Sequence, residues 1–202
     1  MLRALYSSAS GMQAQQMNLD VVANNLANVN TTGFKKSKVE FQDLLYQTDR
    51  SAGSEAGAGN QVPTSLQVGH GARAVATAKI FTNGEMYQTG EKLDIAIHGN
   101  GFFKVTMPDG TDAFTRDGAF KLNNSGGIVT NDGLPVTSFA GVTIPATATN
   151  ISISADGTVS LMDQGTNSTV GQITLSRFAN PAGMESIGNS LLRPTLASGT
   201  EE

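Results

Sequence analysis

The stretch LDIAIHGNGFFKVTMPDGTDAFTRDGAFKL, residues 93–122, carries the clearest fold signal in the chain. Apolar and polar residues alternate along it, which is the period of a half-buried β-strand. Asp-Gly pairs begin at Asp109 and Asp117, and such pairs favour hairpin turns because both residues accept a positive φ. The stretch therefore predicts short antiparallel strands joined by tight turns. We expect the following residues on inward faces: Leu93, Ile95, Ile97, Phe103, Val105, Phe114, Phe120 and Leu122.

The same pattern continues on both sides of this stretch. TNG, residues 82–84, lies between AKIF and EMYQ and predicts another hairpin. Further Asp-Gly pairs begin at Asp132 and Asp156, and GQITLSRF adds a final predicted strand. The hairpin ISISADGTVSLM is expected to bury Ile151, Ile153, Val159 and Leu161. Short strands at turn spacings of roughly 8 to 15 residues favour an antiparallel sandwich or a barrel-like domain over residues 66–180.

Residues 1–30 predict one long amphipathic α-helix of the coiled-coil type. Apolar residues recur there at spacings of 3 and 4, which is the period of a coiled-coil seam. At 1.5 Å per residue such a helix is about 42 Å long, longer than a small domain is wide. We therefore expect the seam to pack in an assembly, whereas a helix lying on its own domain is the ordinary alternative. The seam consists of Leu2, Leu5, Ala9, Met12, Gln16, Leu19, Ala23 and Leu26.

Asparagines crowd the end of this helix in NNLANVNTTGFKK, residues 24–36, although asparagine is a poor helix former. Asn18, Asn25 and Asn28 recur beside the seam, and there side-chain amides could bond neighbouring helices and fix their register, as a buried Asn does in coiled coils. Asn28 and Asn30 fit helix termination before a turn equally well. For these two residues both interpretations stay open.

Residues 31–65 read as a connector. FKKSKVEFQDLLYQ could form a short amphipathic piece, either helical or extended. DRSAGSEAGAGNQVPTS is rich in Gly, Ala and Ser and has little to bury, so it predicts an extended or flexible stretch. Lys35, Lys36 and Lys38 form a basic cluster, which is either a solvated face or a contact with an acidic neighbour.

Charge and cysteine content exclude several classes of function. The formal net charge is −4, so the chain lacks the positive field of a nucleic-acid binder or of a protein that binds anionic membranes. Cysteine is absent, which excludes disulfides, thiolate metal sites and Cys nucleophiles. The amino end has no apolar block of a cleaved secretory signal, and no run approaches the length of a membrane span. We expect neither nucleic-acid binding nor membrane insertion.

Candidate catalytic and metal-binding residues are sparse. His70 and His98 are the only histidines, and they do not have the spacing of zinc ligands. DGTD, residues 109–112, lacks the alternating ligands of a calcium loop, and GNGFF, residues 99–103, is followed by strand patterns where a dinucleotide motif needs a helix. Asp94, Asp109, Asp112 and Asp117 show no pairing of the glycosidase kind. We expect no enzyme activity, cofactor or metal.

The sequence as a whole resembles the bacterial flagellar axial proteins, the rod and hook family. SSASGMQAQQMNLDVVANNLANVNTTGFKKSKVEFQDLLYQT resembles their amino-terminal signature, and the resemblance continues through LQVGHGARAVAT and residues 93–136 to GMESIGNSLL. The connector after LLYQT is most similar to that of the distal rod members. The alternatives are a proximal rod or hook-type member and, from another class, a cell-wall carbohydrate-binding or hydrolytic protein.

The resemblance implies a structural subunit of the basal-body rod, which polymerises into the drive shaft that transmits motor torque to the hook. The implied partners are further copies in a helical homopolymer, other flagellar rod, hook and ring proteins, and the flagellar type III export apparatus. The implied location is the rod spanning the periplasm, reached without a cleaved signal peptide. The residues assigned to inter-helix polar contacts or to the family motif are Asn24, Asn25, Asn28, Asn30, Gly33 and Phe34.

One departure from the family concerns the carboxyl end. Family members end in a second heptad helix that packs on the first, whereas this sequence stops at RPTLASGTEE. We therefore interpret residues 181–202 as a return segment, truncated before the expected carboxy-terminal helix, and expect the chain to be a fragment.

Overall fold

The computed structural model describes residues 2–55, 61–145, 148–163 and 166–202. The chain divides into two compact units. The first contains Met1–Val29 and Lys36–Ile80, and the second contains Asn30–Lys35 and Phe81–Glu202. The short segment Asn30–Lys35 therefore belongs to the second unit, although the residues on both sides of it belong to the first. The backbone passes between the units after residues 29, 35 and 80.

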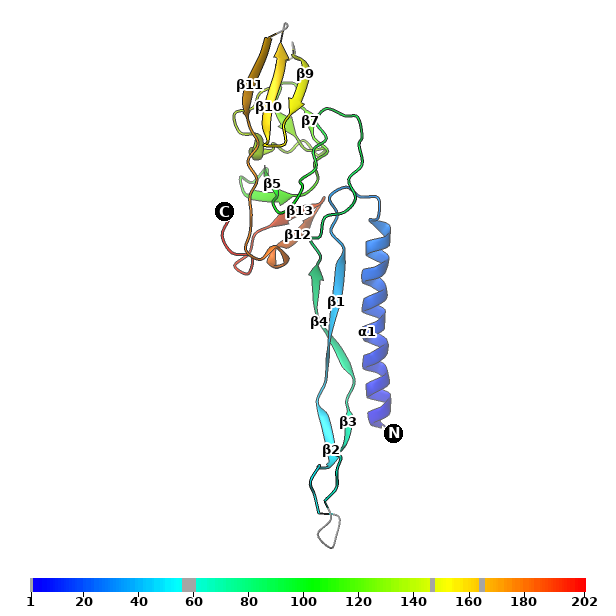
Figure 1. Ribbon diagram of the computed structural model, residues 1–202. Coiled ribbons are helices and arrows are strands. Elements are labelled where there is room, and N and C mark those ends of the chain that lie inside the picture. Colours follow the sequence, from blue (N-terminus) through cyan, green and yellow to red (C-terminus); the bar gives the residue numbers. More distant parts are fainter. Residues whose placement is uncertain (1, 56–60, 146–147, 164–165) are drawn as a thin grey trace. The chain divides into compact units, whose positions relative to one another are not determined.

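The first unit consists of a helix and a β-ribbon. Figure 1 shows strands β1 and β4 continued by β2 and β3, with helix α1 alongside. Both strand pairs are antiparallel, and hydrogen bonds from Leu44 N–H to the Gly71 carbonyl and from His70 N–H to the Leu45 carbonyl join them into one ribbon. The bounds are α1 Leu2–Ala27, β1 Ser37–Asp43, β2 Tyr46–Arg50, β3 Leu66–Gly69 and β4 Ala72–Lys79.

Helix α1 ends close to the predicted boundary. It stops at Ala27, and the Asn28 side-chain amide donates to the Asn24 carbonyl at 2.9 Å. The same carbonyl also accepts the Asn28 backbone N–H at 3.2 Å. This local pairing at the last turn favours the helix-termination interpretation of Asn28. Two strands, β1 and β2, lie within the predicted connector 31–65.

The second unit is built from antiparallel sheets. A four-stranded sheet has the order β12-β13-β6-β5, a three-stranded sheet has the order β11-β10-β9, and β7 pairs with β8. Among the described strands none of these sheets closes into a barrel. The bounds are β5 Phe103–Thr106, β6 Asp112–Thr115, β7 Lys121–Leu122, β8 Ile128–Val129, β9 Ala148–Ile153, β10 Thr158–Asp163, β11 Thr166–Gln172, β12 Glu185–Gly188 and β13 Leu191–Arg193, with short 3₁₀ turns η1 at Thr137–Phe139 and η2 at Pro181–Gly183.

Two aromatic clusters form the core of the second unit. Phe103 packs edge-to-face on Phe120, with ring centroids 5.0 Å apart, in a cluster with the inner faces of β9 and β10. Its neighbour Phe102 belongs to a second cluster, where Phe114 and Phe178 pack edge-to-face at 4.8 Å. Successive side chains of an extended chain point to opposite faces. The adjacent phenylalanines therefore supply two separate clusters.

The predicted fold class is confirmed: the chain is mainly β, with antiparallel sheets and one long amino-terminal helix. The turn at Asp109 joins β5 to β6, with Gly110 at φ +80°. The turn at Asp156 joins β9 to β10, where Val159 and Leu161 are buried as predicted. Local alternation and turn chemistry were sufficient for these two hairpins.

Other predicted strands and turns were wrong. No hairpin forms at Asn83-Gly84, because neither residue has a positive φ and residues 80–102 contain no strand. Asp117-Gly118 does not join paired strands. Leu122 keeps 42% of its surface exposed and is not part of the core.

Three further segments differ from their predicted structure. Leu93, Ile95 and Ile97 do pack against the first cluster, but from an extended segment outside the strand ladders. The predicted final strand GQITLSRF, residues 171–178, does not form, because β11 ends at Gln172 and only Ser176 makes an isolated bridge, to Phe102. The hairpin of β12 and β13 was not predicted at all, because GMESIGNSLL contains neither Asn-Gly nor Asp-Gly.

Candidate assembly surface

One face of α1 carries large apolar side chains that the chain itself leaves exposed. Leu2, Leu5, Met12, Leu19 and Leu26 each keep 66–72% of their surface accessible. The other three members of the predicted seam, Ala9, Gln16 and Ala23, are exposed as well. Large contiguous apolar patches on soluble proteins mark interaction sites. Packing of this seam against other helices stays a prediction.

The opposite face of α1 carries small and polar residues and contacts β1 and β4. We call this face the docking stripe. At about 100° per residue, its centre lies about 180° around the helix from the centre of the seam. Only Ala14 is fully buried on it. The docking stripe consists of the buried and half-buried residues Ser7, Ser10, Gly11, Ala14, Asn18, Val21, Asn25 and Asn28.

Helix and ribbon approach each other closely at Gly71. This residue has φ +108°, and a Cβ placed on it would lie 2.1 Å from the Ser10 Oγ. Nearer the amino end, the Arg3 guanidinium donates to the side-chain carbonyl of Gln47. The positive φ and this close approach both favour glycine just before β4.

Asn25 connects α1 to β1 through two hydrogen bonds. Its Nδ2 donates to the Ser37 carbonyl at 2.8 Å, and its Oδ1 accepts from the Ser37 N–H at 2.9 Å. The neighbouring Asn24 has an exposed side chain. The amide of Asn25 is thus engaged within its own chain, and its predicted contact with a neighbouring helix stays a prediction.

The segment Asn30–Lys35, which we call the docking loop, packs on the rest of the second unit. Gly33 has φ +69°, and a Cβ on it would lie 2.5 Å from the backbone nitrogen of Asp117. The Thr32 Oγ1 donates to the Asp117 Oδ1 at 2.8 Å, and the Lys35 Nζ donates to the Thr82 carbonyl at 2.8 Å. The family-motif residue Gly33 therefore sits in a backbone-to-backbone contact that excludes any larger residue.

Arg116 holds three segments of the second unit together beside the docking loop. Its guanidinium donates to the Gly99 carbonyl at 2.8 Å and to the Asn83 Oδ1 at 3.2 Å, and it lies 5.2 Å from the centre of the Phe102 ring. Burial lowers the pKa of Arg116. Burial, and then the charge of Arg116, lowers the pKa of Lys35. Both cations line a groove of about 560 Å³ together with Asp94, Asp117, Glu85 and Glu91, so its charge is mixed.

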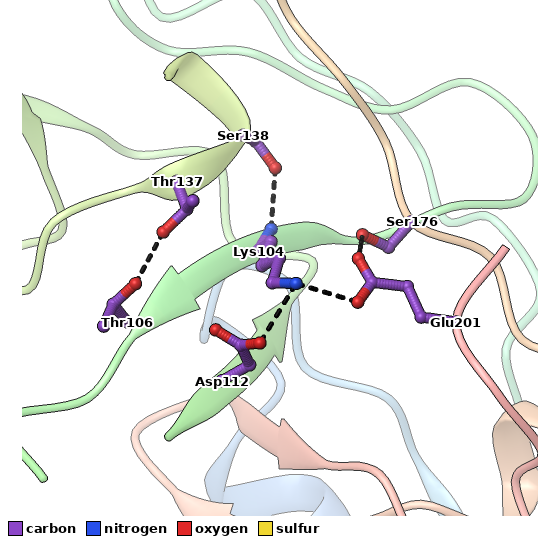
Figure 2. A network of polar contacts seen from close by, with 7 residues as sticks. All are labelled: Lys104, Thr106, Asp112, Thr137, Ser138, Ser176 and Glu201. Atoms are coloured by element: carbon purple, nitrogen blue, oxygen red, sulfur yellow. Dashed lines mark hydrogen bonds and ion pairs between the residues drawn. The ribbon is translucent and has the colours of Figure 1, made fainter. Parts of the chain in front are cut away.

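A polar network connects the end of the described chain to β5 and β6. Figure 2 shows the Lys104 Nζ between the Glu201 carboxylate, at 2.8 Å, and the Asp112 carboxylate, at 3.0 Å. The Ser176 Oγ donates to the other oxygen of Glu201 at 2.6 Å. The hydrogen bonds to Glu201 and then to Asp112 raise the pKa of Lys104. Glu201 is thus held by two side chains from different segments.

Backbone contacts extend this attachment. Arg177 and Glu202 exchange two backbone hydrogen bonds, of 2.8 and 3.0 Å. On the other side of β5, the Lys104 N–H donates to the Ser138 Oγ at 2.7 Å, which Figure 2 also shows. Residues 201–202 are therefore an integrated part of the second unit.

The residues weighed as catalytic or metal-binding have other surroundings. Asp109 accepts hydrogen bonds from Thr111 within its turn, while Asp112 pairs with Lys104 and Asp117 accepts from Thr32. In the described part of the chain, no group of three His, Asp or Glu side chains is arranged to hold a metal ion. None of its helices has the length and hydropathy needed to cross a membrane.

Two family models match the chain. The model for the flagella basal body rod protein covers residues 5–35, which include most of the seam and the docking loop. The model for the flagellar hook protein FlgE/F/G D1 domain covers residues 96–161, which include much of the aromatic core. The first match spans most of α1, in the first unit, and the docking loop, in the second unit, whereas the second match lies within the second unit.

Individual relatives match over the full chain. The flagellar basal-body rod protein FlgG of Borreliella burgdorferi is 47% identical over 205 residues, which is 100% of this chain and 77% of that protein. FlgG of Caulobacter vibrioides is 48% identical, over 98% of this chain and 76% of that protein. The chain belongs to the FlgG family of flagellar basal-body rod proteins. FlgG of Bacillus subtilis, 46% identical over 203 residues, covers 99% of the chain and 76% of its own length.

The extent of the matches distinguishes the rod proteins from the hook protein as relatives of this chain. The flagellar hook protein FlgE of Helicobacter mustelae is 46% identical, but over only 67% of this chain and 30% of that protein. Membership of the FlgG family confirms the resemblance to flagellar axial proteins and the assignment to the rod. The chain is a structural protein of the flagellar basal-body rod and not an enzyme.

Sequence reasoning missed several residues that make the surface. Ser37, Gly71 and Ser190 were not singled out, although Ser37 and Gly71 contact the docking stripe and Ser190 contacts the docking loop. No signal in the local pattern identifies Ser37, because its role depends on the side chain of a residue 12 positions away. Gly71 stands in the Gly-His-Gly run at residues 69–71, where only His70 was considered for a function.

Proposed function

We propose that the chain is a subunit of the distal rod and polymerises through the seam of α1 into the tubular shaft that transmits motor torque to the hook. The observation that supports this most directly is the orientation of α1. Its small-residue face is occupied by the ribbon of its own chain, while its large apolar face has no cover among the described residues. Flagellum-dependent motility would follow from the assembled shaft.

The seam has enough apolar surface to drive assembly. Fully burying five large aliphatic side chains contributes on the order of 7 to 15 kcal/mol, before the costs of association and side-chain ordering are subtracted. Helices from neighbouring copies are the partners proposed for this surface. Contacts between different surfaces of identical subunits, related by a rotation that does not close, generate a helical filament.

The second unit is proposed to resist twisting between neighbouring subunits of the shaft. Interlocking rings of Phe103, Phe120 and Phe139 fill one of its two clusters, and close-packed interiors deform little under load. Residues 49–65 of the connector are proposed to fill gaps between subunits and to set the stiffness of the shaft. The proposed domain division is 1–30 for the axial helix, 31–65 for the connector, 66–180 for the β domain and 181–202 for the return segment.

The individual partner proteins, the export route and the location in the periplasm are part of the same proposal. Other rod, hook and ring proteins would contact the assembled subunits, and the flagellar type III apparatus would export the chain without a cleaved signal peptide. The rod would then span the periplasm. Membership of the FlgG family supports assembly with other flagellar components.

Immunogold electron microscopy tests the location. An antibody against the second unit is applied to purified basal bodies and to rods stripped of their rings. Label confined to the distal shaft is the expected result. Label on the proximal shaft or the hook, or on no axial structure, would overturn the assignment to the distal rod.

A pair of matched variants tests the seam. Leu19→Asp places a charge in the seam, whereas Tyr6→Asp places one at a similarly exposed site of α1 outside it. Sedimentation of concentrated protein should show assembly lost in Leu19→Asp and retained in Tyr6→Asp, with the thermal transition of the β unit unchanged in both. Equal assembly of the two variants would contradict the role of the seam.

A further inference from the structure

The side chain of Asn25 stands where a third strand would lie. Ile80 N–H bonds the Lys36 carbonyl at 3.0 Å, and in an antiparallel pair this places Ser37 and its partner Lys79 in a non-hydrogen-bonded position. The backbone groups of Ser37 therefore point outward, toward an open edge. The Asn25 amide takes both of them, donating at 2.8 Å and accepting at 2.9 Å.

Apolar burial alone does not explain why the docking stripe of α1, and not the seam, faces the ribbon. The docking stripe buries Ala14 and half-buries Val21, whereas the seam leaves five large apolar side chains in water. Hydrophobic stabilisation grows with the apolar area removed from water. A helix free to rotate on the ribbon would therefore gain apolar burial by turning its seam inward. The observed orientation rests instead on specific contacts, namely the close approach at Gly71, the hydrogen bond from Arg3 to Gln47 and the two hydrogen bonds of Asn25.

We propose that Asn25 is the positioning residue that fixes the rotation of α1 on the ribbon and thereby keeps the seam outward. The two hydrogen bonds require one geometry, because rotating the helix by a single residue moves Asn25 about 100° away from β1. A buried Asn in a coiled coil selects one register in the same way, at some cost in stability. Here the amide selects which face of the helix stays available.

This inference concerns the isolated chain and does not depend on the rod function proposed above. It assigns Asn25 a role within the chain, in contrast to Asn24. Asn24 is adjacent, identical in chemistry and exposed. Replacing Asn24 therefore controls for changes in helix propensity without touching the contact with Ser37.

Thiol labelling reports the orientation directly, because the chain contains no cysteine. Leu19→Cys places a single thiol on the seam, and Ala14→Cys places one on the docking stripe. In dilute protein with Asn25 present, the thiol at position 19 should react at least about tenfold faster than the thiol at position 14. This factor corresponds to about 1.4 kcal/mol at 25 °C.

The decisive comparison is between Asn25→Ala and Asn24→Ala in both reporter backgrounds. Asn25→Ala should slow labelling at position 19 and accelerate it at position 14, so that the ratio falls about tenfold. Asn24→Ala should leave the ratio unchanged. If Asn25 served only to stabilise docking, its loss would release the helix, and position 19 would stay fast while position 14 accelerated. That result, or an unchanged ratio, would overturn the proposal.

A second variant covers the case in which Asn25→Ala fails to fold. Asn25→Asp keeps an acceptor for the Ser37 N–H but places a second acceptor opposite the Ser37 carbonyl, so it should change the ratio in the same direction. Far-ultraviolet circular dichroism confirms that the helix persists. A folded Asn25→Asp protein with an unchanged ratio would equally overturn the proposal.

Discussion

Substitution of Gly33 by alanine should destabilise the second unit through a contact that no side-chain movement relieves. Gly33 has φ +69°, and a Cβ there would lie 2.5 Å from the Asp117 nitrogen and 2.8 Å from the Arg116 carbonyl carbon. Both atoms belong to the backbone. Relief would therefore require the docking loop to move away from its contact, with loss of the hydrogen bond from Thr32 to Asp117.

The loss of stability expected for Gly33→Ala has two parts. A non-glycine residue in the left-handed region costs about 1–2 kcal/mol, and inserting a methyl group into a tightly packed site costs about 1–3 kcal/mol. Gly33→Ala should therefore lower the free energy of unfolding by about 2–5 kcal/mol. The variant Gly110→Ala measures the backbone part alone. Gly110 has φ +80° in the same unit, and a Cβ there would have no neighbour within 4 Å.

Urea unfolding is followed by hydrogen exchange of peptides from residues 81–202. It measures the stability of the second unit in each variant, separately from that of the first unit. This separation matters because a chain with two units need not unfold in one step. Gly110→Ala should lose only about 1–2 kcal/mol. If the two variants were equally stable within about 0.5 kcal/mol, which is the usual scatter of independent sites, the tight contact of the docking loop would be refuted.

Three other changes have expected outcomes. Ser190 has φ +58° in the turn between β12 and β13, so Ser190→Gly should stabilise the second unit by about 0.5–1 kcal/mol in urea unfolding, because glycine adopts this conformation without strain. The raised pKa of Lys104 means that its contact with Glu201 stabilises the fold below the ordinary lysine pKa and is lost as the pH rises through the folded-state pKa, above 10.5. An NMR titration should show the pKa of Lys104 falling in Glu201→Gln. Phe103→Ala should cost about 3–5 kcal/mol, and Phe41→Ala, at an exposed site, much less.

Contrary results would be informative in each case. A loss of stability in Ser190→Gly would show that the hydroxyl outweighs the backbone strain. An unchanged Lys104 pKa in Glu201→Gln would remove Glu201 as the main cause of the shift. Equal losses in Phe103→Ala and Phe41→Ala would contradict the position of Phe103 at the centre of the first cluster.

Local sequence signals predicted the elements whose structure depends mainly on local chemistry. The 3 and 4 spacing from Leu2 to Leu26 identified α1. The Asp-Gly pairs at Asp109 and Asp156 identified the two hairpins whose glycines adopt a positive φ. In these cases the residues that decide the structure are neighbours in the sequence.

The same signals failed where contacts with residues far away in the sequence decide the local structure. Asn-Gly permits a positive φ but does not require one, and at Asn83 the side chain instead accepts a hydrogen bond from Arg116. Gly118 is needed for another reason, because a Cβ there would lie 1.7 Å from the Ile95 carbonyl oxygen. A turn propensity does not reveal such a close approach.

The sequence by itself determined that α1 exists, which of its residues share each face, and that the chain resembles the flagellar axial family. Only the tertiary structure decided which face meets the ribbon and which stays exposed. Periodicity arranges residues around a helix, but the choice between faces rests on contacts with distant residues, such as those of Asn25 with Ser37. The docking loop follows the same rule, since Thr32 and Asp117 are 85 positions apart and meet only because the chain folds back on itself.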